Sequence, residues 1–179
     1  ADFFGGDARL IAGRAGGLDV IAVDAPHLYD RPGNPYVNAA GVDWPDNAQR
    51  FAALSFAAYE LARGTVEGYR PQILHCHDWQ AALVPAYNMY NAPTPAKTVL
   101  TVHNIAFQGR FGWDVFNSLK IDYRSANEGA IEYFGGIGYL KDKVPNFEPS
   151  WTMFDRADLK AKDPGMLKVL EKVWGIEIK

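Results

Sequence analysis

Residues 70–87 read RPQILHCHDWQAALVPAY, and this stretch predicts the fold. Pro71 precedes a short run of mostly apolar residues, 72–76, which is typical of a strand that the chain enters from a turn. Residues 81–90 follow as a predicted helix, in which Pro85 favours a kink. A strand that leads directly into a helix is the unit from which parallel sheets are built.

Similar segments lie on both sides of this unit. Residues 18–26, LDVIAVDAP, are predicted to form a buried strand, and residues 98–102 a third strand of almost continuous apolar character. Residues 46–63 are the clearest helix, with Asp43 or Asp46 as the capping residue. This alternation predicts an α/β fold, with a Rossmann-like parallel sheet that carries helices on both faces.

The composition is that of a folded protein. Of the 179 residues, 48% are hydrophobic and 22% charged, and the net charge is −3, so neither a disordered chain nor a nucleic-acid-binding surface is indicated. No apolar run approaches the roughly 18–20 residues of a membrane span, and the first residues lack the signal-peptide pattern. The single cysteine, Cys76, is typical of a reducing compartment, so a cytoplasmic location is expected.

Polar side chains follow three of the predicted strands at the point where each strand ends. Asp24 ends the first strand, His77 and Asp78 end the second, and His103 and Asn104 end the third. Ligands of parallel α/β sheets bind beyond the carboxyl ends of the strands. We therefore expect these side chains to lie on the ligand side of the sheet.

The histidines allow two interpretations. His75 and His77 would point to the same face of a strand and, with Asp78, could bind zinc or iron in a metal-dependent hydrolase. Such a site usually needs a further cluster of ligands, and no acidic residue lies close to His103 in the sequence. Alternatively, His75 is a buried strand residue, Cys76 faces the core, and the polar side chains at the strand ends form a pocket.

Aromatic residues close to the strand ends favour a pocket for a sugar. Tyr36, Trp79 and Phe107 could present ring faces to the C–H surface of a sugar, although each could equally pack in the core. Carboxylate and amide groups would bind the hydroxyls. The sequence contains neither a G-x-S-x-G elbow nor a Walker loop, so a serine hydrolase and a phosphate-loop protein are not indicated.

Four segments occur together in an order that is specific to one family. They are DAPHLYDRPGNPY at 24–36, DNAQRFAALSFAAYELARG at 46–64, RPQILHCHDWQAALVPAY at 70–87 and TVHNIAFQGRF at 101–111. From about residue 8 to residue 141 the chain resembles the N-terminal catalytic lobe of bacterial glycogen synthases and plant starch synthases. This resemblance implies one incomplete lobe of a two-lobed glycosyltransferase of the GT-B type, whose active site lies in the cleft between two Rossmann-like lobes.

The resemblance also implies an activity. The family transfers glucose, with retention of configuration, from ADP-glucose (UDP-glucose in some members) to the non-reducing end of an α-1,4-glucan in glycogen biosynthesis. It requires no metal ion or other cofactor. The catalytic residues would be His103, which contacts the transferred glucose, and Asp78, which supports the sugar site. The residues that bind the substrate would be Tyr36, His77, Trp79, Asn104 and Gln108.

The resemblance covers only part of the family's length. Residues 1–141 are expected to form a partial N-terminal starch synthase catalytic domain, and residues 142–179 a divergent tail with a helix at 164–174. The second lobe carries most of the nucleotide contacts and is a possible partner. We therefore expect the isolated chain to lack transferase activity, and a non-catalytic α-glucan-binding module is the alternative function.

Overall fold

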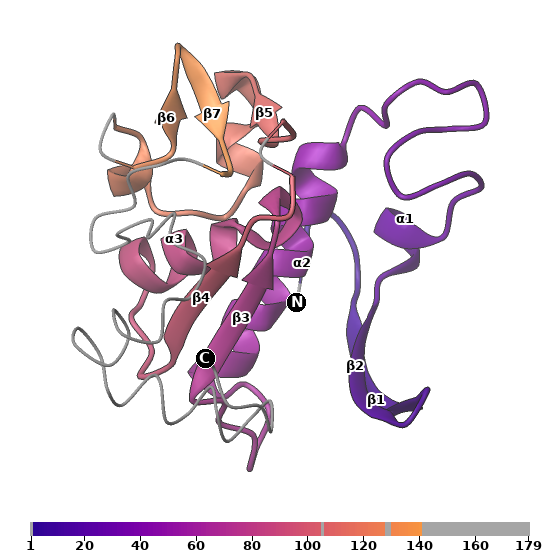
Figure 1. The fold of residues 1–179 in the computed structure, drawn as a ribbon, viewed down its shortest axis with the longest axis vertical. Helices are drawn as coiled ribbons and strands as arrows, with labels where there is room; N and C mark the ends of the chain where they lie inside the picture. The colour runs from indigo at the N-terminus through magenta and orange to yellow at the C-terminus, as the bar shows by residue number, and fades with distance from the viewer. Residues whose placement is uncertain (1, 105, 128–129, 141–179) are drawn as a thin grey trace. The chain divides into compact units, whose positions relative to one another are not determined.

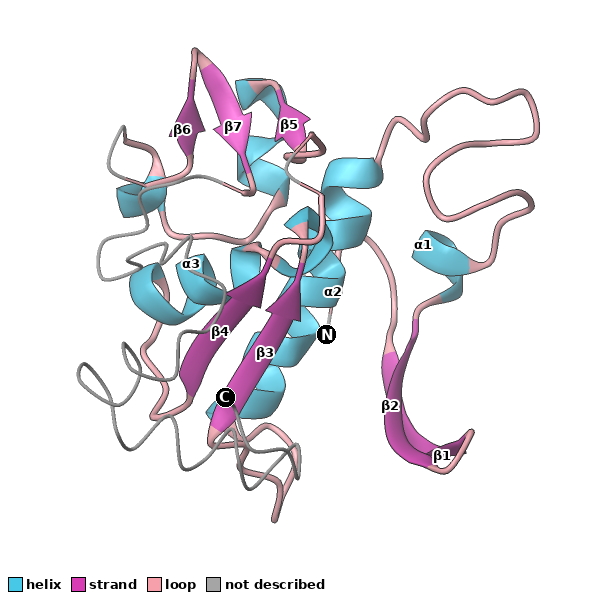
Figure 2. Ribbon diagram, viewed as in Figure 1, coloured by secondary structure: helices cyan, strands magenta, loops and turns pink. Residues whose placement is uncertain are grey.

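The computed structural model describes residues 2–104, 106–127 and 130–140 (Figures 1 and 2). The predicted helix at 164–174 and the predicted tail at 142–179 lie outside these residues. The strands and longer helices are β1 (Arg9–Ala15), β2 (Leu18–Asp24), α1 (Pro26–Tyr29), α2 (Asn47–Arg63), β3 (Ile73–His77), α3 (Leu83–Tyr90), β4 (Lys97–Thr101), β5 (Arg110–Phe111), β6 (Glu132–Tyr133) and β7 (Gly136–Gly138). Short 3-10 turns cover Trp79–Ala81, Trp113–Ser118 and Tyr123–Ser125.

The strand–helix–strand unit around residues 70–101 is confirmed. Strands β3 and β4 pair in parallel, with His75 opposite Val99 and Cys76 opposite Leu100, and α3 makes the connection between them. Pro85 lies in the first turn of α3, where its missing N–H has no partner within the helix, so the helix tolerates it. A kink at Pro85 stays a prediction. The protein is therefore of the α/β class with a parallel sheet.

The two faces of β3 and β4 have different roles. Cys76 and Leu100 leave the same face, since they are opposite one another in the parallel register. Cys76 is 4% exposed and Leu100 packs against the main core, so the prediction that Cys76 faces the core is confirmed. By alternation, His75 and His77 occupy the opposite face.

Helices α2 and α3 supply most of that core and lie on one side of the parallel strands (Figure 2). Tyr59 of α2 stacks on Tyr87 of α3 with ring centroids 5.7 Å apart, and both side chains are fully buried. The hydroxyl of Tyr139 donates to the carbonyl of Ala48 at 2.7 Å, which attaches the segment after β7 to the start of α2. That helices also cover the opposite face of β3 and β4 remains a prediction.

The boundaries of α2 agree with the sequence. It runs from Asn47 to Arg63, and Gly64 ends it in the left-handed conformation, φ +85°. Asp46 occupies the N-cap position, but its side chain makes no capping bond. Its carboxylate instead accepts two hydrogen bonds from Arg31, at 2.5 and 2.6 Å, and thereby attaches the preceding loop to the helix start.

Residues 18–24 form a strand, as predicted, but the prediction that this strand is buried in the parallel sheet is wrong. Strand β2 pairs in antiparallel fashion with β1, and every residue of β1 is exposed. Gly16 and Gly17 both have positive φ, which suits the tight turn of a two-residue hairpin. A short apolar run does not identify its own partner strand, and here the two glycines allow the preceding segment to pair with it.

A small three-stranded sheet of order β5–β7–β6 completes the described elements. β5 is antiparallel to β7, with Arg110 opposite Gly138. Within the described residues, every helix is too short or too polar to cross a membrane.

Candidate functional site

The candidate site is built around the turn that follows β3. The N–H of Asp78 donates to the carbonyl of Thr101 at 2.8 Å and so continues the parallel ladder beyond His77. The Asp78 carboxylate accepts the backbone N–H of His103 at 2.6 Å and lies 3.4 Å from the N–H of Asn104. Asp78 therefore holds the ends of both strands together.

The backbone of Asp78 is strained. Its φ is +54° and its ψ is −171°, a combination close to a region that is essentially reserved for glycine. Such conformations persist only where the surrounding contacts enforce them, and they gather at functional sites. Here the Asp78 carboxylate, held in this conformation, accepts the backbone N–H of His103 in the turn after β4.

His77 and His103 form a direct pair. His77 Nδ1 lies 3.0 Å from His103 Nε2, and the two rings stack with centroids 5.3 Å apart and an interplanar angle of 14°. A neutral imidazole has one donor and one acceptor nitrogen, so one ring donates and the other accepts. The pair uses Nε2 of His103 and leaves Nδ1 as the nitrogen that can face a ligand.

The ring of His75 lies next to that of His77, on the same face of β3. Its Nε2 lies 2.7 Å from the hydroxyl of Thr101, and its ring centroid is 4.3 Å from that of His77. Burial, and then the proximity of His77 and His103, lower the pKa of His75 below its ordinary value of 6.5. His75 is therefore held in its neutral form at neutral pH.

An aromatic group adjoins the same turn through Trp79. Tyr36 is 41% exposed, and its ring centroid lies 5.7 Å from that of Phe51 and 6.3 Å from that of Trp79. Trp79 meets Phe51 edge-on at 4.6 Å and packs against the core, so its main contacts are structural. Tyr36 is the most exposed ring of this group, and Phe107, predicted to present a ring face as well, is 63% exposed.

Gln108 lies beside the aromatic group, because the next residue, Gly109, packs closely against the Trp79 ring. Gly109 has φ +61°, and a Cβ atom at this position would lie 2.4 Å from the Trp79 ring. The carbonyl of Gln108 accepts the N–H of Leu140 at 3.1 Å, which fixes the chain direction beside the small sheet. The side chain of Gln108 is half-buried.

The structure thus brings the predicted site residues into two adjoining groups, and each group includes residues from the turn at 77–80. The polar group contains His77, Asp78, His103 and Asn104. The aromatic group contains Tyr36 and Trp79, and Gln108 lies beside it. Asp24 does not join them, contrary to the prediction for the strand ends. It accepts hydrogen bonds from Arg9 within the β1–β2 hairpin, because β2 is not part of the parallel sheet.

A metal site at these residues has little support. One oxygen of the Asp78 carboxylate, Oδ1, already accepts the backbone N–H of His103 and lies near that of Asn104. Across residues 2–104, 106–127 and 130–140, no group of three or more His, Cys, Asp or Glu side chains is arranged to hold a metal ion.

Two residues that support the site were not predicted from the sequence. Arg50, only 5% exposed, donates to the carbonyls of Leu28 and Pro35, both at 2.8 Å, and so holds the loop that carries Tyr36. An arginine inside an apolar helix is a usable signal for such a role. Gln80 donates to the Tyr36 hydroxyl at 2.7 Å, and nothing in the sequence around it indicates this contact.

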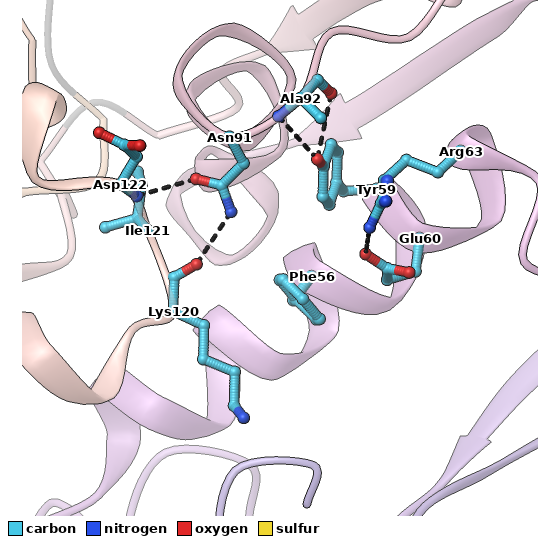
Figure 3. Close-up of a pocket in the computed structure, with 9 residues that line it drawn as sticks. All are labelled: Phe56, Tyr59, Glu60, Arg63, Asn91, Ala92, Lys120, Ile121 and Asp122. Carbon is cyan, nitrogen blue, oxygen red and sulfur yellow. Dashed lines mark hydrogen bonds and ion pairs between the residues drawn. The ribbon is translucent and has the colours of Figure 1, made fainter. Parts of the chain in front are cut away.

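A separate pocket of about 400 Å³ lies beside the C-terminal half of α2 (Figure 3). None of the predicted site residues lines it; its lining residues are Phe56, Tyr59, Glu60, Arg63, Asn91, Ala92, Lys120, Ile121 and Asp122. Its charged side chains are already paired: Arg63 with Glu60 at 2.7 Å, Lys120 with Asp2 at 3.2 Å, and Asp122 with Arg124 at 2.9 Å. The pocket therefore offers no unpaired charge for a ligand.

Comparisons with known proteins agree on one family. Residues 5–146 match the family described as the starch synthase catalytic domain. A glycogen synthase of Rhodopseudomonas palustris (strain HaA2) is 46% identical over 172 residues, which cover 93% of this chain and 35% of that protein. A glycogen synthase of Acidiphilium cryptum (strain JF-5) is 48% identical over 167 residues, which cover 92% of this chain and 35% of that protein.

A solved structure gives the same result for the fold. The catalytic domain of starch synthase IV from Arabidopsis thaliana, bound to ADP and acarbose, is similar with a TM-score of 0.60 and 25% sequence identity. The similarity covers 74% of this chain and 27% of that one. The chain therefore spans only about a third of the length of the curated relatives named above.

Proposed function

The chain belongs to the starch synthase catalytic domain family, and from this premise we propose that it forms part of a retaining glycosyltransferase. The proposed reaction transfers glucose from ADP-glucose to the non-reducing end of an α-1,4-glucan, as in glycogen biosynthesis. The glycogen synthases named above support this reaction, and the Arabidopsis structure, solved with ADP and acarbose, supports an adenine nucleotide and a glucan as the substrates. The proposed compartment is the cytoplasm, which agrees with the unpaired Cys76.

In the proposed step, the bond between C1 of glucose and the diphosphate oxygen breaks. A hydroxyl oxygen of the glucan bonds to C1 on the same face, and its proton passes to the departing phosphate oxygen. No protein side chain has to remove that proton. The protein's contribution is to orient the sugar and to stabilise the charge that develops in the transition state.

The observation that carries this proposal is the contact between Asp78 and the backbone of His103 at the ends of β3 and β4. It fixes the position of His103, which we propose to contact the transferred glucose through Nδ1. His77 fixes the orientation of that ring through the hydrogen bond between the two imidazoles. Asp78 would act in catalysis by positioning His103, and Asn104 would lie in the same pocket.

Tyr36, Trp79 and Gln108 are proposed to complete the substrate pocket. Tyr36 presents an exposed ring, while Trp79 supports it from the core side. We further propose that residues 1–141 are part of the first lobe and that residues 142–179 form a distinct tail. A cleft enzyme needs both walls to exclude water and to hold the diphosphate, so the chain alone should be inactive.

The test uses a chimera. Residues 8–141 would replace the corresponding part of the Acidiphilium cryptum glycogen synthase, and incorporation of labelled glucose from ADP-glucose into glycogen would be measured. We expect incorporation by the chimera, none by the 179-residue chain, and a loss of at least about a hundredfold in the His103→Ala chimera. A folded but inactive chimera would refute the proposed function.

The alternative function is distinguished by measuring glycogen binding of the 179-residue chain beside glucose transfer by the chimera. If the 179-residue chain binds glycogen while its folded chimera transfers no glucose, the non-catalytic glucan-binding module is the better description. If the chain alone incorporates glucose, the expectation that it is inactive is wrong.

A further inference from the structure

We propose that Gln80 is a positioning residue: it fixes the hydroxyl end of Tyr36 at the site and leaves the Tyr36 hydroxyl proton for an oxygen of the glucan. This inference rests on the proposed function and names a residue that supports it. The proposal is based on the 2.7 Å hydrogen bond in which Nε2 of Gln80 donates to the Tyr36 hydroxyl oxygen.

The direction of this bond decides what Tyr36 can offer. A phenol oxygen that accepts an N–H bond still has its own proton to donate. With the amide in this orientation, Tyr36 is a donor toward a sugar oxygen. With the amide reversed, the Tyr36 proton would be used by Gln80, and the hydroxyl could only accept.

The rest of Tyr36 is held independently of Gln80. Its carbonyl accepts the side-chain N–H of Asn47 at 2.8 Å and the backbone N–H of Trp44 at 3.1 Å. Its ring lies beside Phe51 at an interplanar angle of 30°. The loop and the ring plane are thus fixed by α2, and Gln80 acts on the hydroxyl end.

Gln80 is itself held in place by the core. The hydroxyl of the fully buried Ser55 donates to the Gln80 carbonyl at 3.2 Å. The side-chain oxygen Oε1 of Gln80 is buried and has no hydrogen-bond partner among the described residues. An unsatisfied buried acceptor is costly, so its presence calls for an explanation. We infer that the amide keeps this orientation because its N–H group serves Tyr36.

The short turn after β3 therefore organises both groups of the site. Asp78 fixes the backbone of His103, and two residues later Gln80 fixes the hydroxyl of Tyr36. The proposed sugar-contacting residues come from segments far apart in the sequence, yet residues 78–80 contact both.

The first test needs no ligand. Side-chain amide resonances of Gln80 would be followed by NMR in the 179-residue chain and in its Tyr36→Phe variant. Tyr69→Phe is the matched control, since Tyr69 is 42% exposed against 41% for Tyr36 and its hydroxyl is not the one that accepts the Gln80 amide N–H. We expect the Gln80 resonances to shift only in Tyr36→Phe. Equal spectra for wild type and Tyr36→Phe would overturn the inference.

The second test measures maltotriose affinity by titration of the same chain. Gln80→Leu and Tyr36→Phe should each weaken binding about three- to tenfold, the worth of one neutral hydrogen bond, and the double variant should lose no more than either alone. Gln80→Glu, whose carboxylate accepts the Tyr36 proton, should lose at least as much as Gln80→Leu. Additive losses, or wild-type affinity in Gln80→Glu, would overturn the proposal.

The two proposals fail separately. If the wild-type chain binds no maltotriose, the role of Gln80 toward a sugar is overturned, whatever the chimera does. If the chimera is folded but inactive, the transferase function fails, while the non-additive loss of maltotriose binding still supports Gln80. In an active chimera, Gln80→Leu should raise the KM for glycogen more than it lowers kcat.

Discussion

Asp78 combines a strained backbone with a carboxylate whose partners are backbone N–H groups of the next strand end. Asp78→Ala leaves the His103 N–H without its acceptor and should lower the free energy of unfolding by about 1–2 kcal/mol. Asp78→Asn keeps an oxygen acceptor and should lose less than half of that. Urea unfolding of the two variants checks this, and equal losses would show that the hydrogen bond is not what Asp78 contributes.

His75 makes the stability depend on pH. Its pKa is lowered in the folded protein, mainly by burial. As the pH falls below about 6.5, the unfolded chain therefore binds a proton that the folded chain does not, and the free energy of unfolding decreases. This contribution is absent above that pH, where His75 is neutral in both states.

His75→Gln should flatten that decrease between pH 7 and pH 5, because glutamine does not titrate. Urea unfolding at a series of pH values measures it for both proteins. The prediction is wrong if the two stability curves have the same slope over this range.

At the scale of elements, the start of the small sheet depends on one glycine. Gly109 and Gly135 both have positive φ, at +61° and +77°, but only at Gly109 would a Cβ atom meet the Trp79 ring. Gly135→Ala should cost about 1 kcal/mol for its backbone alone. Gly109→Ala should cost about 2–4 kcal/mol, since the overlap with Trp79 is added.

Thermal unfolding of the two alanine variants tests this difference. The displaced ring should also change the fluorescence of Gly109→Ala and leave that of Gly135→Ala unchanged. Equal stabilities would mean that Trp79 moves aside without cost and that β5 does not depend on this contact.

At the scale of the whole molecule, stability is concentrated in the α2–α3 core. Leu83 is fully buried there, whereas Leu18 in the β1–β2 hairpin is 70% exposed. Leu83→Ala should lower the free energy of unfolding by about 3–5 kcal/mol, and the same change at Leu18 by no more than about 0.5 kcal/mol. Urea unfolding measures both, and a comparable loss at Leu18 would show that the hairpin shares in the core.

Several features were predictable because their signals are local. The limits of α2 follow from helical periodicity and from Gly64, whose lack of a side chain suits the left-handed end of the helix. Strands β3 and β4 follow from short apolar runs bounded by proline and by polar residues. Cys76 was expected to face the core, because alternation along a strand places it opposite His75 and His77.

The α/β class, the family and the presence of polar residues at two neighbouring strand ends could all be predicted from the residues alone, since each depends on order and spacing along the chain. The hairpin formed by β2, which keeps Asp24 away from the site, became visible only in the fold, because packing and turn geometry select the partner of a strand. The tertiary structure also decided that His77 contacts His103 and that Gln80 contacts Tyr36. These contacts join residues 26 and 44 positions apart, where no local pattern carries information.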